Sequence, residues 1–208
     1  MRGKFLTLEG GEGAGKSTNL RFIEHYLQQQ GIDLVITREP GGTELGEAIR
    51  GLLLDKQYKT MTASCELLLM FAARAQHIET LIKPALAAGK WVVSDRFTDA
   101  TYAYQGAARG LGFDRIAPIE DWVQQGFSPD CTFVFDLPVE IGMQRVAQRG
   151  NEVDRFEQEQ LAFFEAVRQA YLLRASRSAE RYCVLDAAQP LEAVQIHIKN
   201  QLNRLIEQ

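Results

Sequence analysis

The stretch Gly10–Ser17, with the sequence GGEGAGKS, limits the possible folds of this chain more than any other segment. Its spacing of Gly10, Gly15, Lys16 and Ser17 fits the template G-x-x-x-x-G-K-S/T, in which consecutive backbone N–H groups surround a phosphate. The glycines are needed because such a loop adopts backbone conformations that side chains would block. In this template Lys16 reaches the outer phosphates of a nucleotide and the Ser17 hydroxyl binds Mg²⁺.

The segments on either side match the strand, loop and helix order that the template requires. Residues 4–9, KFLTLE, are apolar and rich in strand formers. After the loop, Leu20, Ile23 and Leu27 recur at helical spacing, and Gly31 provides a stop. A flexible glycine turn is the alternative interpretation, and this context argues against it.

Five apolar stretches predict the strands of one sheet, at residues 4–9, 33–39, 90–95, 131–137 and 181–187. They are mostly continuous apolar runs, which are typical of parallel strands covered by helices on both faces. Helical patterns separate them, as in a layered α/β fold. We therefore expect an α/β protein of the P-loop NTPase class, with a five-stranded parallel sheet and a small lid, as a single domain over residues 1–208.

The helical patterns lie at residues 17–31, 43–54, 63–88, 116–125, 139–150, 151–175 and 190–206. The third is expected to kink or restart near Lys83, because Pro84 lacks the N–H that a continuous helix needs. The sixth opens with charged residues. No repeat or linker divides the chain.

Composition favours a soluble protein and argues against two kinds of partner. Apolar residues make up 46% of the chain, which is ordinary for a globular protein with a core. The longest apolar run, residues 67–73, is far too short to cross a bilayer, and the N-terminal residues do not read as a signal peptide. A net charge of −4 gives no support to nucleic-acid binding. We expect a cytoplasmic protein that binds neither membranes nor nucleic acid.

The basic, thiol and imidazole side chains carry further information. Arginine outnumbers lysine by 16 to 7, and its planar fork suits phosphate oxygens, although a solvated surface explains many of these residues equally well. The cysteines form no C-x-x-C pair and are expected to be buried free thiols. The histidines lack ligand spacing and are expected on helix surfaces. These residues are Cys65, Cys131, Cys183, His25, His77 and His197.

Ligands of open α/β sheets lie beyond the carboxyl ends of the strands. That rule brings several distant segments to one crevice. They are Gly10–Ser17, Arg38–Gly42, Asp95–Arg96, the start of the helix after Leu137, and the turn after Asp186.

Asp95 ends an apolar strand, and an acidic residue there is the expected second metal anchor of a phosphate-loop protein. Capping of the next turn is the alternative role. Arg96 is placed to hold an acceptor phosphate, or else to form a surface ion pair of little energetic value.

Three further segments offer ligand-binding side chains with competing interpretations. Arg38 and Glu39 face either the ligand or each other, at a Pro-Gly turn. Residues 70–74, MFAAR, place apolar side chains and an arginine on one helix face, which also fits a core segment with an exposed arginine. Residues 101–106, TYAYQG, offer hydroxyl, phenol and amide groups suited to a sugar or a base.

Arg145, Arg149 and Arg155 flank a glycine-containing turn. A lid with arginines excludes water and stabilises charge on a transferred group. An ordinary helix connection with solvated arginines is the alternative.

Five motifs in order resemble the thymidylate kinase family, in particular its bacterial type. They are LEGGEGAGKST (8–18), TREPGGTELGE (37–47), FAARAQH (71–77), SDRFTDATYAYQG (94–106) and RGNEVDRFEQE (149–159). The resemblance covers essentially the whole chain. It implies a transferase that phosphorylates dTMP to dTDP with ATP and Mg²⁺ in dTTP synthesis, and it implies a homodimer.

The resemblance also implies the site residues. The catalytic ones are Lys16, Asp95, Arg96, Arg149 and Arg155, and the metal anchors are Ser17 and, through water, Asp95. ATP is held by Gly10, Gly11, Glu12, Gly13, Ala14, Gly15, Lys16, Ser17, Thr18, Arg145 and Arg149. dTMP is held by Glu12, Arg38, Pro40, Met70, Phe71, Arg74, Arg96, Thr101, Tyr104 and Gln105.

Within that set the resemblance implies individual roles. Glu12 lies near the sugar 3′-hydroxyl, Arg74 hydrogen-bonds thymine, and Thr101 and Gln105 read its other edge. Tyr104 lies against C2′ of the sugar. Either Met70 or Phe71 packs on the base, and the lid at about residues 146–157 supplies the catalytic arginine.

Two other functions are compatible with a phosphate loop. Another nucleoside or nucleotide kinase on the same fold is the nearer one. A nucleotide-dependent switch is the other, and the absence of the guanine-reading sequence Asn-Lys-x-Asp argues against it.

Overall fold

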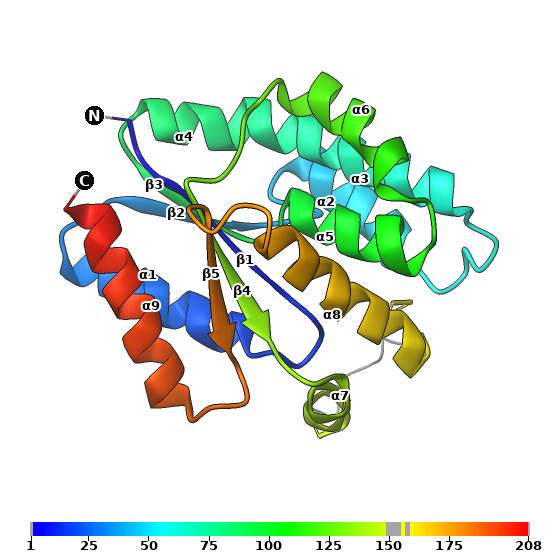
Figure 1. Ribbon diagram of the computed structural model, residues 1–208. Helices are drawn as coiled ribbons and strands as arrows, with labels where there is room; N and C mark the ends of the chain where they lie inside the picture. Colours follow the sequence, from blue (N-terminus) through cyan, green and yellow to red (C-terminus); the bar gives the residue numbers. More distant parts are fainter. Residues whose placement is uncertain (1, 149–154, 157–158, 208) are drawn as a thin grey trace.

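The computed structural model describes residues 2–148, 155–156 and 159–207. Its centre is a parallel five-stranded sheet in the order β2-β3-β1-β4-β5 (Figure 1). The strands are β1 Phe5–Gly10, β2 Leu34–Arg38, β3 Trp91–Asp95, β4 Cys131–Asp136 and β5 Tyr182–Asp186. All five predicted strands, and the predicted α/β class, are therefore confirmed.

Helices connect these strands. They are α1 Lys16–Gln29, α2 Glu44–Leu54, α3 Ala63–His77, η1 Ile78–Ile82, α4 Lys83–Ala87, α5 Thr98–Thr101, η2 Tyr102–Ala108, α6 Phe113–Gln124, α7 Val139–Ala147, α8 Leu161–Ala175 and α9 Leu191–Ile206. The predicted restart is confirmed, because α4 begins at Lys83 with Pro84 in its first turn. The π-helical turn η1 precedes it, where the normal hydrogen-bond pattern is interrupted.

The helix predicted at residues 151–175 is wrong at its start. α8 begins at Leu161, and Arg155 and Phe156 lie outside it. The Arg155 Nε donates to the Leu53 carbonyl oxygen at 2.8 Å, and Phe156 is buried. These tertiary contacts hold the two residues in a turn and outweigh local helix propensity.

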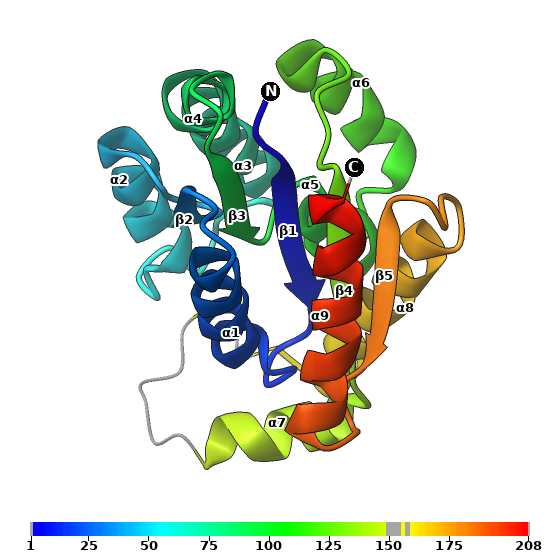
Figure 2. The ribbon, with the colours of Figure 1, turned by 90° about the vertical axis from the view of Figure 1, so that its left-hand side faces the viewer.

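Helices cover both faces of the sheet, as Figure 2 shows. α1 and α9 pack on one face, where alternate residues of β1 such as Leu6 and Leu8 join the main core. On the other face Phe5 packs with α4 and η1, and Val134 packs with α8. Thr7 and Thr132 share a buried hydrogen bond of 2.8 Å between adjacent strands.

β1 lies at the point where the strand order changes direction. Its neighbours are β3 on one side and β4 on the other, so the loop after Gly10 opens into the crevice between them. This is the position where open α/β sheets bind ligands.

The prediction for the cysteines is partly wrong. All three are free, and Cys131 is buried, but Cys183 is half-buried and Cys65 is exposed in the first turn of α3. Helical periodicity places Leu67 on the buried face of α3, and Cys65 lies away from that face.

Candidate active site

The loop between β1 and α1 is shaped by glycines. Gly13 and Gly15 have φ values of 72° and 87°, in the left-handed region that side chains rarely adopt. A Cβ on Gly13 would also lie 2.2 Å from the carbonyl oxygen of Gly142 on α7. The first turn of α1 contains no acidic residue, so the positive end of its dipole is free to attract an anion.

Lys16 and Asp95 bring opposite charges to this loop. The Lys16 Nζ donates to the carbonyl oxygens of Gly10 and Gly11, at 3.0 and 2.9 Å. Burial lowers the pKa of Lys16 below its usual value, and Arg96 lowers it further. The buried Asp95 Oδ1 has no hydrogen-bond partner among the described residues. An orphaned carboxylate oxygen of this kind is available to a ligand, a metal-bound water or a cation.

Glu12, Arg96 and Tyr104 form one cluster beside the loop. Glu12 accepts hydrogen bonds from Arg96 Nη2 and from the Tyr104 hydroxyl, the latter at 2.9 Å. The Arg96 guanidinium lies over the Tyr104 ring, 4.7 Å from its centroid. Burial lowers the pKa of Arg96, but Tyr104 and Glu12 outweigh it and raise the pKa well above its usual value. Arg96 is therefore a permanent cation, held with a φ of 71°.

Arg74 also lines the crevice and is 2% exposed. Its Nε donates to Glu39 Oε2 at 2.7 Å, and its Nη2 donates to Thr101 Oγ1 at 2.9 Å. The buried Nη1 has no hydrogen-bond partner among the described residues. Arg74 therefore has unused N–H donors at the edge of the crevice, which it lines.

Gln105 is oriented by a buried carboxylate. Its Nε2 donates to Glu66 Oε1 at 2.7 Å, and Glu66 is 1% exposed. Arg155 and Arg109 also donate to Glu66. Because a carboxylate flanked by guanidinium groups only accepts, the amide nitrogen of Gln105 must face it. The amide oxygen is left for the crevice.

These groups line one crevice with a cavity of about 190 Å³. It brings together the following predicted residues: Glu12, Gly13, Ala14, Gly15, Lys16, Ser17, Pro40, Met70, Arg74, Asp95, Arg96, Thr101, Tyr104 and Gln105. Other predicted residues are described but do not line it, namely Gly10, Gly11, Thr18, Arg38, Phe71, Arg145 and Arg155. Arg149 and most of the predicted lid lie outside the described residues.

Met70 and Phe71, and likewise Arg38 and Glu39, lie in different surroundings. Met70 lines the crevice, whereas Phe71 is buried in a cluster with Leu67 and Tyr102. The side chain of Arg38 pairs with Glu47 on α2, at 2.7 Å, and that of Glu39 pairs with Arg74.

Sequence reasoning missed several lining residues, of which Arg50 has the clearest chemistry. Its Nη1 donates to the Pro40 carbonyl oxygen at 3.0 Å. The sequence spacing could have indicated it, because Gly46, Arg50 and Leu54 recur every four residues and so share one face of α2. Leu54 on that face also lines the crevice. Phe97, Ala100 and Phe156 were missed as well.

Arg145 joins three segments on the far side of the phosphate loop. Its Nη1 lies 3.4 Å from the Gly13 carbonyl oxygen and 3.3 Å from that of Ala187. Through Arg145 the last turn of α7 and the turn after β5 thus meet the loop, whereas the strand-end rule named the start of this helix.

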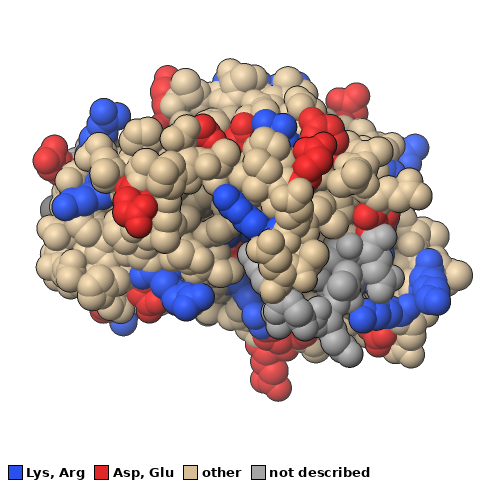
Figure 3. Space-filling model, turned by 90° about the horizontal axis from the view of Figure 1, so that it is seen from below, with Lys and Arg blue, Asp and Glu red and all other residues tan. Residues whose placement is uncertain are grey.

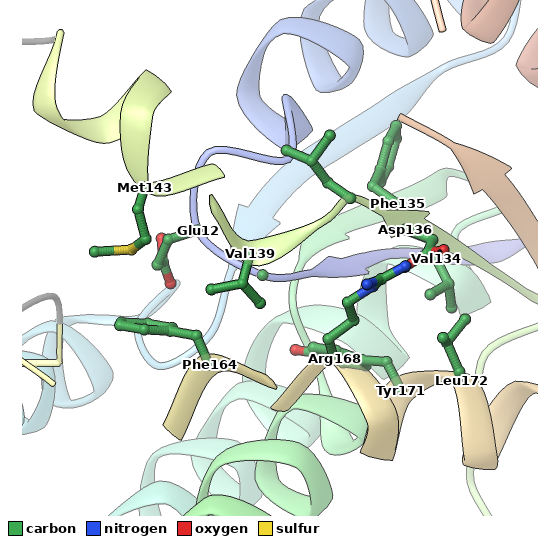
Figure 4. Close-up of a pocket in the computed structure, with 12 residues that line it drawn as sticks. Glu12, Val134, Phe135, Asp136, Val139, Met143, Phe164, Arg168, Tyr171 and Leu172 are labelled. Carbon is green, nitrogen blue, oxygen red and sulfur yellow. Dashed lines mark hydrogen bonds and ion pairs between the residues drawn. The ribbon is translucent and has the colours of Figure 1, made fainter. Parts of the chain in front are cut away.

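A second, much smaller cavity lies behind Glu12, between β4, α7 and α8 (Figure 4). Val139, Met143 and Phe164 surround it, and Arg168 spans its edge to pair with Asp136 at 2.6 Å. At about 20 Å³ it has room for roughly one water molecule. It is too small for a substrate.

The prediction that the histidines lie on helix surfaces is wrong for His77. This residue is fully buried, and its ring nitrogens contact Glu39 Oε1 and Thr37 Oγ1, at 2.9 and 2.7 Å. It follows Arg74 by three positions on α3, so both lie on the face that packs against the crevice wall. His25 and His197 are exposed, as predicted.

Glu9 is a buried acid directly before the phosphate loop. Its Oε1 accepts the Phe97 N–H at 2.7 Å, which fixes the peptide after Arg96. Burial, aided by the nearby Asp99, raises the pKa of Glu9 to about 8. Glu9 is therefore mostly protonated at neutral pH.

This pKa makes stability depend on pH. Between about pH 4.5 and 8 Glu9 is protonated in the folded protein but ionised in the unfolded chain, so unfolding releases a proton. The free energy of unfolding therefore falls as the pH rises through that range. Glu9→Gln mimics the neutral acid, and we expect it to remove a fall in the free energy of unfolding on the order of 2–4 kcal/mol between pH 5 and pH 7.5. Urea unfolding at pH 5 and pH 7.5 measures this. The exposed Glu192→Gln is the control, and equal slopes in wild type and Glu9→Gln would contradict the assignment.

The surface charge, the hydropathy of the helices and the clustering of potential metal ligands are relevant to the predicted partners. On the face seen in Figure 3 acidic and basic side chains are interspersed. Among the described residues no helix is long and apolar enough to cross a membrane. No group of three or more His, Cys, Asp or Glu side chains suited to a metal occurs in the described part of the chain.

Comparison with known proteins gives a consistent result. The family model described as thymidylate kinase matches residues 8–198. Proteins named thymidylate kinase from Pseudomonas putida (strain GB-1) and Pseudomonas entomophila (strain L48) are each 60% identical over 207 residues, covering 100% of this chain and 98% of the relative. One from Chromohalobacter salexigens is 57% identical over 201 residues, covering 96% and 95%.

Proposed function

The chain belongs to the thymidylate kinase family, whose members phosphorylate dTMP to dTDP with ATP, and we propose how its crevice performs this transfer. The phosphate loop and Lys16 bind the triphosphate of ATP. Arg74, Thr101 and Gln105 bind the base of dTMP. The single observation that carries the proposal is that both sets of side chains line one cavity, which Arg96 lines as well.

Charge neutralisation is the main task of this site. The acceptor is a phosphate monoester with a second pKa near 6, so at neutral pH its attacking oxygen is already ionised and needs no general base. The obstacle is repulsion between two polyanions. Lys16 on the donor side, with Arg96 and Arg50 on the acceptor side, supplies the opposing charge.

Mg²⁺ is proposed at the loop side of the crevice. Ser17 lines the cavity, and the orphaned Asp95 Oδ1 is an acceptor that suits a metal-bound water. Few protein ligands are needed, because this ion keeps several waters and binds substrate phosphates. When bound, it neutralises charge on the phosphates.

Selection of thymine follows from donor and acceptor positions. The free Nη1 of Arg74 offers donors to the O4 carbonyl, and the oriented Gln105 oxygen accepts the N3–H. Cytosine has an amino donor in place of O4 and an acceptor in place of N3–H, so both contacts would be mismatched. Met70 is the residue proposed to pack on the base.

The sugar end of dTMP is proposed to meet Glu12 and Tyr104. Tyr104 is 6% exposed and packs edge-on against Phe156, so the wall beside the sugar is rigid. A ribose 2′-hydroxyl would need space that this wall does not offer.

We propose that the lid is part of a single domain and that its two arginines differ in role. Arg155 is already bonded to Glu66 and to the Leu53 carbonyl oxygen, which suits an anchor. Arg149 is the proposed arginine at the transferred group. Arg145, beside Ala187, is proposed at the adenine end of ATP.

The assembly and location are also proposals. A homodimer is supported by exposed apolar residues on two packed helices, Leu68 on α3 and Trp122 on α6, which are 59% and 78% exposed. Light scattering would then give twice the chain mass of 23.4 kDa. A cytoplasmic location follows from the role in dTTP synthesis.

The proposal predicts a clear order of substrates. With ATP and Mg²⁺, kcat/KM should be highest for dTMP, and dCMP should fall below it by about 10²-fold or more, because buried polar groups would be left unpaired. Thymidine should be inactive, because its neutral 5′-hydroxyl would need a general base to remove a proton, whereas the phosphate of dTMP is already ionised. A coupled assay of ADP formation with dTMP, dUMP, dCMP and thymidine measures this. Efficient turnover of dCMP would refute the base pairing, and turnover of thymidine would favour a nucleoside kinase.

A further inference from the structure

A buried chain of hydrogen bonds lies behind the base-binding end of the crevice. Glu39 accepts Arg74 Nε on one oxygen, at 2.7 Å, and contacts His77 Nδ1 through the other, at 2.9 Å. His77 Nε2 continues the chain to Thr37 Oγ1 on β2, at 2.7 Å. All four side chains are buried, and His77 is fully enclosed.

Hydrogen-bond chemistry fixes the direction of this chain. Glu39 only accepts, so His77 Nδ1 carries its hydrogen and donates to it. With Nε2 unprotonated, the Thr37 hydroxyl donates to the ring, and each atom in the chain has a partner. Glu39 and Arg74 then form a single neutral ion pair, whereas a charged imidazole would leave a net positive charge in a dry site. In this arrangement the His77 Nδ1–H is the donor to Glu39.

The same histidine supports the loop that closes this end of the crevice. A Cβ on Gly42 would lie 2.5 Å from His77 Nε2 and 2.4 Å from Thr37 Oγ1. The loop backbone thus rests directly on this pair. Pro40, two residues earlier, lines the cavity. His77 thus contacts Glu39, which binds Arg74, and the loop that contains Pro40. His77 itself does not line the cavity.

We propose that His77 is a positioning residue for base selection, which acts through Glu39 to hold the Arg74 guanidinium in the orientation that reads thymine. This rests on the proposed contact between Arg74 and the base. Glu39 Oε1 would lose its donor without the imidazole, and the carboxylate would then rotate. Arg74 would keep its charge and its Nη2 hydrogen bonds to the Phe97 carbonyl oxygen and Thr101, but the guanidinium would be held less firmly at Nε. Nη1 would then point less accurately at the base, so dTMP binding and base discrimination weaken while phosphoryl transfer does not.

Two amide substitutions separate this role from general packing. Asn at position 77 places its amide nitrogen where His Nδ1 lies, so His77→Asn keeps the donor to Glu39. His77→Gln places its amide group near the Nε2 position, so it reaches toward Thr37 and leaves Glu39 without that donor. Both are polar amides of similar burial cost, which makes them a matched pair. His25→Asn, at an exposed histidine on α1, controls for loss of an imidazole.

The experiment measures kcat, the KM for dTMP and the dTMP to dCMP ratio of kcat/KM for each variant, with thermal unfolding to confirm folding. We expect His77→Gln to raise the KM for dTMP by about tenfold and to lower that ratio by a similar factor. We expect His77→Asn to stay within about threefold of wild type, and both variants to keep kcat within about twofold.

Other outcomes overturn the proposal. It fails if the two variants behave alike, if kcat falls instead of KM rising, or if folded His77→Asn alone shows a tenfold rise in KM. Arg74→Lys distinguishes this failure from that of the proposed function. An unchanged KM in Arg74→Lys overturns the base contact and the inference together, whereas a raised KM there with normal His77→Gln overturns the inference only.

Discussion

Replacing Arg149 by alanine is expected to lower kcat for dTMP phosphorylation by about 10³-fold or more, with the KM for dTMP within about threefold. An arginine that contacts the transferred group stabilises charge that develops only in the transition state, so its loss reduces kcat and spares substrate binding. The family resemblance places this arginine in the lid, and Arg149 lies outside the described residues. Steady-state kinetics with saturating ATP measures the effect.

Arg155→Ala is the matched comparison in the same segment. Arg155 is bonded to Glu66 and the Leu53 carbonyl oxygen and lies over the Phe156 ring, 4.6 Å from its centroid. We expect its loss to lower the melting temperature and to reduce kcat by less than about tenfold, because it removes an anchor rather than a charge at the transferred group. A kcat that survives Arg149→Ala but collapses in Arg155→Ala would reverse the two roles.

Replacing Lys16 by methionine is expected to reduce kcat/KM for ATP by about 10²–10³-fold or more. In the proposed function the Lys16 ammonium group faces the donor phosphates, and no other side chain of the loop, Gly10–Ser17, carries a positive charge. Stability should be retained or improved. Burial already lowers the pKa of Lys16, which means that holding this charge costs folding free energy.

Kinetics and calorimetry together test that expectation. dTMP affinity should stay within about threefold in Lys16→Met, because the acceptor site has its own arginines. The exposed Lys56→Met is the control for loss of one positive charge. Equal losses of ATP and dTMP binding in Lys16→Met would show that the variant damages the crevice as a whole.

Features set by local pattern were predictable from the sequence. The five strands were found because parallel strands buried on both faces are continuous apolar runs. The phosphate loop and the helix restart at Lys83 follow from glycine and proline stereochemistry. The gathering of Lys16 and Asp95 in one crevice followed from the rule for strand ends, whereas Arg74 was added only by the family resemblance.

Features set by tertiary contacts were not predictable in this way. The burial of His77 depends on β2 and the Gly42 loop, which cover a helix face that α3 alone does not define. The late start of α8 depends on the contact of Arg155 with Glu66, 89 positions earlier in the chain. Arg50 was missed because an arginine on an amphipathic helix is usually solvated.

Isothermal titration of dTMP into the protein with Mg²⁺, before and after saturation with a non-hydrolysable ATP analogue, tests the central claim most directly. If one cationic crevice holds both nucleotides end to end, dTMP binds one per chain in each case, and the analogue does not displace it. If dTMP and the analogue exclude each other, or if neither binds, the crevice does not align donor and acceptor as described.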